Sequence, residues 1–122
     1  MAEIFTFFYD YQICLNLFHF QTDSYASHKA SDAHLSKFRE HFDRFLEVWQ
    51  GAFGHINFEH PQQINISNVT SNREIIEHTH MINGYLNDLS KELTEINHTY
   101  LVNIIDEIIA DNKQFIYLLT FT

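Results

Sequence analysis

Three acidic residues in the first half of the chain are spaced as cation ligands often are. Glu40, Asp43 and Glu47 follow one another at steps of three and four residues, so in a helix they form one ridge within about two turns. His28 lies seven residues before Leu35, which places it on the face expected to pack into the core. Carboxylates and neutral imidazoles are ligands that iron, zinc and manganese accept, and such ligands come from more than one helix or subunit.

The same residues also have a purely structural interpretation. A histidine on an apolar face is more often a hydrogen-bonded core residue than a ligand, which applies to His28. Asp43 and Glu47 alone would form a solvated face, paired with Arg39 or Arg44. Four other histidines are expected at the surface: His34, His41, His55 and His60. His78 and His80 are two residues apart and cannot share one helix face, so a joint site is not expected there. Cys14 is expected to be a small core residue.

The elements that position these residues follow from apolar periodicity. The chain has 122 residues, 45% of them hydrophobic, with one proline and three glycines, which predicts a single domain over residues 1–122 with one core. Apolar residues recur at three- and four-residue steps and predict helices over about 3–20, 24–50, 72–96 and 99–119. Gly51 and Gly54 are expected to follow the second helix, and Ser71 with Glu74 forms a capping-box pattern before the third.

Residues 53–70 predict a long connection that includes the only proline, Pro61. A connection of this length suits two helices that lie parallel. The sequence therefore predicts an all-α four-helix bundle of ferritin-like topology, with a long crossover between helices two and three. Helix one is expected to pair with helix two, and helix three with helix four. The apolar breadth of helix one predicts a homo-oligomer, at least a dimer, that buries it further.

Charge and composition exclude several classes of function. A net charge of −9 argues against binding to nucleic acid or to an anionic membrane. One cysteine excludes an internal disulfide and a cysteine-only metal site. The apolar N-terminal segment lacks a basic start and is interrupted by Asp10 and Asn16, so neither a signal peptide nor a spanning helix is expected. The expected location is the cytoplasm. If the protein is viral, this would be the cytoplasm of the host cell or the interior of the virion. No phosphate loop or nucleophile elbow supports a hydrolase.

Three stretches carry a resemblance to a known family. They are LFHF at 17–20, YASHK at 25–29, and the segment from Asp43 to Glu47, with Asp43 fifteen residues after His28. This pattern resembles the Dps-type mini-ferritins, in which a histidine followed by an aromatic residue ends the first helix. In that family the second helix carries a histidine, an aspartate and a glutamate at this same spacing, and a long crossover follows.

The resemblance implies an inter-subunit di-iron site. His19 and His28 would come from one subunit and Asp43 and Glu47 from a two-fold-related neighbour. Iron(II) would bind there and be oxidised by oxygen or peroxide, and the mineral would collect inside a hollow oligomer. The gap from His19 to His28 is nine residues, shorter than in the family, so Asp32 is a substitute ligand if His19 is displaced. Glu40 could extend the site.

A second resemblance leads to a different function. Residues 21–30, 47–51 and 103–107 are similar to short ferritin-like proteins of unassigned function from phages and large viruses. This implies the bundle fold without the activity. The alternative function is therefore a non-enzymatic structural or interaction protein, such as a viral accessory or virion component, that has no functional metal site.

Overall fold

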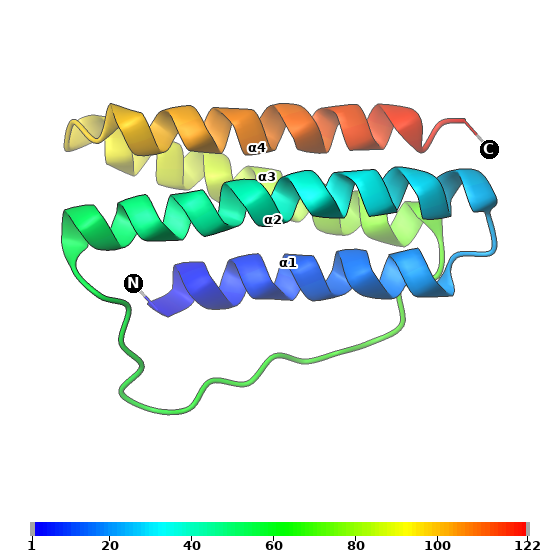
Figure 1. The fold of residues 1–122 in the computed structure, drawn as a ribbon, viewed down its shortest axis with the longest axis horizontal. Helices are drawn as coiled ribbons and strands as arrows, with labels where there is room; N and C mark the ends of the chain where they lie inside the picture. The colour runs from blue at the N-terminus through cyan, green and yellow to red at the C-terminus, as the bar shows by residue number, and fades with distance from the viewer. Residues whose placement is uncertain (1, 122) are drawn as a thin grey trace.

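The computed structural model describes residues 2–121, and they fold as a four-helix bundle (Figure 1). The helices are α1 (Ala2–Gln21), α2 (Tyr25–Phe53), α3 (Asn72–Glu95) and α4 (Thr99–Leu118). No strand occurs within these residues. The prediction of an all-α bundle with four helices is confirmed, and three of the helices differ from the predicted bounds by at most one residue at either end.

Side chains define the starts of two helices. Ser24 caps α2, since its hydroxyl accepts a hydrogen bond from the backbone N–H of Ser27 at 3.2 Å. Ser71 caps α3 in the same way, and Glu74 accepts a hydrogen bond from the N–H of Ser71 at 3.2 Å. This reciprocal pair is the predicted capping box, which satisfies two amide groups that a helix start leaves without intrahelical acceptors.

The end of α2 differs from the prediction. The helix continues through Gly51 to Phe53, and Gly54 ends it with a φ of 96°, a conformation that favours glycine. The Gly54 N–H donates to the carbonyl of Gln50. The extra turn places the ring of Phe53 at 4.4 Å from that of Trp49, a contact that offsets the low helix propensity of Gly51.

The helices are arranged as two antiparallel hairpins joined by a crossover. α1 packs against α2 and α3, and α4 packs against the same two helices. Figure 1 shows α2 and α3 running in the same direction, so residues 54–71 must return along the length of the bundle. Val69 anchors the end of this crossover: its side chain is buried and its N–H donates to Gln21 at 2.8 Å. The predicted pairing of helices one with two and three with four is confirmed.

Aromatic rings fill one half of the core. Phe8 is fully buried and lies edge-on to the rings of Phe38, Phe42 and Phe45 at 5.0–5.9 Å. Such geometry adds about 0.5–1.5 kcal/mol per pair to the burial of area. Aliphatic side chains of α3 and α4 supply the other half, among them Ile75, Leu86, Leu101 and Ile105.

A polar layer crosses the centre of this apolar core. The Tyr11 hydroxyl lies 3.2 Å from His34 Nε2, 2.9 Å from Thr79 Oγ1 and 3.2 Å from Asn112 Oδ1. Asn112 in turn donates to Asn83 at 2.7 Å. Each helix contributes at least one member, and buried polar groups linked in this way fix how helices align along the bundle axis.

Candidate metal site

Two histidines meet at the turn between α1 and α2. The rings of His19 and His28 stack with centroids 3.9 Å apart and planes inclined by 18°. His19 Nδ1 lies 3.0 Å from the carbonyl oxygen of His28, and His28 Nδ1 lies 2.7 Å from the carbonyl oxygen of His19. The shorter gap between these residues therefore still brings both imidazoles together, each bonded to the other's backbone.

These hydrogen bonds determine the tautomer of both rings. A carbonyl oxygen can only accept, so the hydrogen of each neutral ring is on Nδ1. The Nε2 atoms of His19 and His28 then carry free lone pairs, and neither has a hydrogen-bond partner within residues 2–121. A metal-binding histidine is commonly held in this way, with one nitrogen donating to a carbonyl and the other available to the metal.

Two carboxylates form a second pair on the C-terminal half of α2. A hydrogen bond to Asp43, and the charge of Asp43, raise the pKa of Glu47. Both side chains are exposed. Two neighbouring carboxylates repel each other, and a bound cation relieves that repulsion. Asp43 also borders a shallow hollow of about 300 Å³ on the α1–α2 face, beside Tyr9 and Leu46.

The two pairs are far apart within one subunit. His28 and Asp43 are separated by fifteen residues of one helix, or about 22 Å at 1.5 Å per residue. Asp32 and Glu40 are both exposed on α2 between them. Within residues 2–121, no three His, Cys, Asp or Glu side chains are grouped so that they could hold a metal ion. One subunit therefore presents two separate pairs of candidate ligands, which we call half-sites.

His34 is placed differently from the prediction. The surface position expected for it is wrong, because only 5% of its area is exposed and it belongs to the central polar layer. Its ring stacks on Phe115 at 4.3 Å. Burial lowers the pKa of His34 to about 4, so the ring is neutral at pH 7. Its spacing of four residues from Phe38 was the sequence signal, since that step keeps it on the buried face.

His41 lies in a contact between α2 and α4. It was expected at the surface, but it is only partly exposed, with Nε2 3.2 Å from Glu107 and Nδ1 3.1 Å from Asp111. One turn earlier, Lys37 donates to Gln114 at 3.0 Å. Lys37 and His41 of α2 thus face polar side chains of α4, and His41 lies within the contact between the two helices.

Comparison with known proteins gives one match. A family described as "Family of unknown function (DUF5856)" matches residues 19–119. The chain belongs to the DUF5856 family. The matched segment includes both half-sites, from His19 to Glu47, and all of the crossover. Neither the comparison with curated proteins nor the comparison with solved structures gave a match for this DUF5856 chain. Across residues 2–121, none of the helices has the length and apolar character needed to cross a membrane.

Proposed function

We propose that this protein is a ferritin-like, Dps-type mini-ferritin that binds and oxidises iron(II) between two subunits. His19 and His28 of one subunit would hold the iron together with Asp43 and Glu47 of the partner subunit. Iron(II) is the substrate, and oxygen or peroxide is the oxidant that accepts its electrons. The observation that carries the proposal is the histidine pair, whose two Nδ1–H groups are bound by carbonyls so that both Nε2 atoms are left as ligands.

A two-fold dimer through α2 brings the half-sites together. His28, Asp32, Arg39 and Asp43 lie within an arc of about 60° on α2, at 100° per residue. An axis that crosses α2 midway between His28 and Asp43 places each of them opposite the other in the partner subunit. The same axis places Asp32 opposite Arg39 of the partner subunit, so that two pairs of opposite charge support the same dimer.

The crossover supports the ferritin-like topology. Two antiparallel hairpins, joined by a long connection between parallel helices, are the arrangement of ferritin-like bundles. The polar layer at the centre of this bundle contains neutral groups and no carboxylate. Carboxylate ligands for iron are therefore available on the α1–α2 face and not in the centre, which favours a site between subunits.

Metal content and iron oxidation test the proposed activity directly. Protein purified from iron-containing medium should carry iron in elemental analysis, and the metal-free protein should oxidise added iron(II) faster than buffer does. Carboxylate ligands must be deprotonated to bind iron, and Asp43 raises the pKa of Glu47, so uptake should rise with pH as Glu47 ionises. Iron-free protein that oxidises iron(II) no faster than buffer would falsify the proposal.

Exchanging the charges of Asp32 and Arg39 tests the proposed dimer. Asp32→Arg places like charges opposite each other twice per dimer and should raise the dissociation constant at least about tenfold. The double variant Asp32→Arg with Arg39→Asp restores both pairs and should recover the dimer. Sedimentation equilibrium with a chelator present measures this without metal bridging, and Asp106→Arg on the exposed side of α4 is the matched control. If the double variant stays as weak as the single one, this dimer is not the one that forms.

A second candidate function is a non-enzymatic interaction protein, favoured by exposed aromatic rings at one end of the bundle. Phe20 and Tyr25 are 77% and 73% exposed beside the α1–α2 turn, and Tyr117 and Phe121 are exposed at the end of α4. Figure 1 places these segments at the same end of the molecule. Exposed aromatic clusters of this kind mark contacts with other proteins. An assembly that is unchanged by chelators, in a protein with no iron oxidation, would favour this function.

A further inference from the structure

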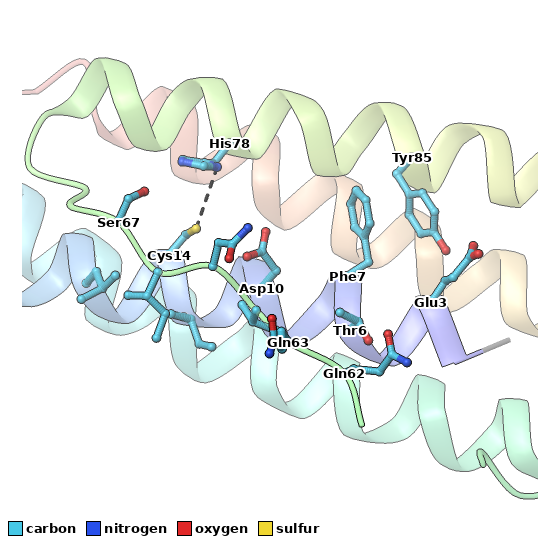
Figure 2. A pocket seen from close by; sticks show the side chains of 15 residues that line it. Glu3, Thr6, Phe7, Asp10, Cys14, Gln62, Gln63, Ser67, His78 and Tyr85 are labelled. Carbon is cyan, nitrogen blue, oxygen red and sulfur yellow. Dashed lines mark hydrogen bonds between the residues drawn. The ribbon is translucent and has the colours of Figure 1, made fainter. Parts of the chain in front are cut away.

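A recess that does not involve the iron half-sites lies between α1, α3 and the crossover. Its volume is about 600 Å³, and residues 62–67 of the crossover form one wall. Figure 2 shows this part of the chain passing along α1, with His78 and Tyr85 of α3 on the opposite side. Cys14 Sγ lies 3.8 Å from His78 Nδ1 and joins the two helices beneath the recess. We call it the α1–α3 cavity.

The charges in the cavity exclude an anionic ligand. Glu3 and Asp10 line it, and none of its fifteen lining residues is a lysine or an arginine. Burial raises the pKa of Cys14 to about 11, so the thiol is uncharged at pH 7. A carboxylate or phosphate group would meet two negative charges here, and the one basic group in the lining, His78, is already hydrogen-bonded to Cys14. An ammonium group would be attracted by both carboxylates.

The cavity has two chemically different halves. In the acidic half, Phe7 lies between Glu3 and Asp10 along α1, and its ring stacks on Tyr85 at 4.0 Å. Burial raises the pKa of Tyr85 to about 12, so this ring pair is neutral at pH 7. Aromatic faces beside carboxylates bind cations favourably. The other half is lined mainly by Ile13, Leu17, Ile64 and Ile66, with Ser67 and His78 at its border, and we call it the aliphatic half.

We propose that the α1–α3 cavity binds a long-chain aliphatic amine. Its ammonium group occupies the acidic half, and its alkyl chain lies along the aliphatic half. Asp10 and Leu17 are seven residues apart on α1, or about 10 Å, which is the length of an alkyl chain of about eight carbons. This ligand matches both the charge of one half and the apolar surface of the other.

Calorimetric titration of the whole protein with butylamine, hexylamine and octylamine tests the length and the charge of the ligand. Each added methylene should raise the affinity by up to about fourfold, because it is buried against aliphatic side chains. Octanoate, which has the same apolar chain and the opposite charge, should not bind. Equal binding of octanoate and octylamine, or equal binding of butylamine and octylamine, overturns the proposal.

Variants of acidic residues locate the ammonium group. Asp10→Asn keeps the shape and removes the charge, and should weaken octylamine binding about tenfold. Asp106→Asn makes the same change on an exposed part of α4 outside the cavity and should leave binding unchanged. Equal weakening by both variants would mean that the amine binds the acidic surface in general, and the proposal would be wrong.

Nuclear magnetic resonance places the ligand without any substitution. Octylamine should shift the backbone amide signals of Phe7, Cys14 and residues 62–67, and leave those of α4 in place. Shifts confined to α4 or to the exposed end of the bundle would contradict the proposed position of the amine. This result does not depend on whether the Asp10→Asn variant folds, because the protein is unchanged.

Discussion

Mixing two inactive variants should restore about a quarter of the iron sites. His28→Ala removes a ligand from one half-site and Glu47→Ala removes a ligand from the other, so each variant alone should oxidise iron(II) only at the rate of buffer. In a mixed dimer, one of the two sites combines both substitutions and the other has neither. Random pairing of equal amounts makes about half of the dimers mixed. Since one of the two sites in each mixed dimer is intact, about a quarter of all sites are active. The measurement is the initial rate of iron oxidation after the variants are unfolded together and refolded.

The matched controls use the same residue types away from the half-sites. His80→Ala and Glu92→Ala change exposed side chains of α3 and should oxidise iron(II) as the parent protein does. If His28→Ala and Glu47→Ala are inactive alone and their mixture gains nothing, the ligands do not meet across a dimer. Activity that survives in either variant alone would remove that residue from the proposed ligand set.

Acid should destabilise the protein through His34. Burial lowers the pKa of His34 to about 4 from the ordinary 6.5, so the unfolded chain binds a proton between these values and the folded chain does not. Stability is therefore fully present above pH 6.5, falls as the pH is lowered to 4, and is constant below it as far as this residue is concerned. The loss amounts to about 3 kcal/mol. Urea unfolding at pH 7.5 and 4.5, at one protein concentration, measures it.

A comparison of variants separates the contribution of His34 to this loss of stability from the contribution of carboxylates that titrate in the same pH range. His34→Gln cannot bind the proton, so its free energy of unfolding should change less between the two pH values than that of the parent protein, by about 2.5 kcal/mol. His80→Gln, at an exposed position of α3, should keep the full change. The explanation fails if the His34→Gln protein loses as much stability in acid as the His80→Gln protein.

The features predicted correctly are those encoded locally. Ser71 and Glu74 form their predicted capping box within one turn. Apolar periodicity defines each helix from its own residues, because only one face of each is buried. The crossover followed from the absence of a sustained period between Phe53 and Thr70 together with its length.

The features that sequence reasoning missed depend on several helices at once. His34 is buried because α1, α3 and α4 supply the groups that surround it, and a single helix cannot indicate which polar residue will find such partners. Gly51 stays helical because the next turn adds the contact between Phe53 and Trp49. His19 and His28 were expected on separate helices, but their mutual backbone hydrogen bonds, which fix both tautomers, could be seen only from the geometry of the turn.

The crossover also marks where the chain can accept new sequence. Residues 54–71 contribute one side chain, that of Val69, to the buried core, and His55, Asn57, Glu59 and His60 are exposed. Each doubling of the length of a flexible loop costs only about 0.6 kcal/mol. An inserted peptide or small domain between Glu59 and His60 would therefore leave the packing of the two hairpins intact, including the contact of Phe58 with Phe5 at 5.4 Å, and it would lie outside the segment 62–67 that lines the α1–α3 cavity. This stretch is the natural position in the protein for a tag or a binding module.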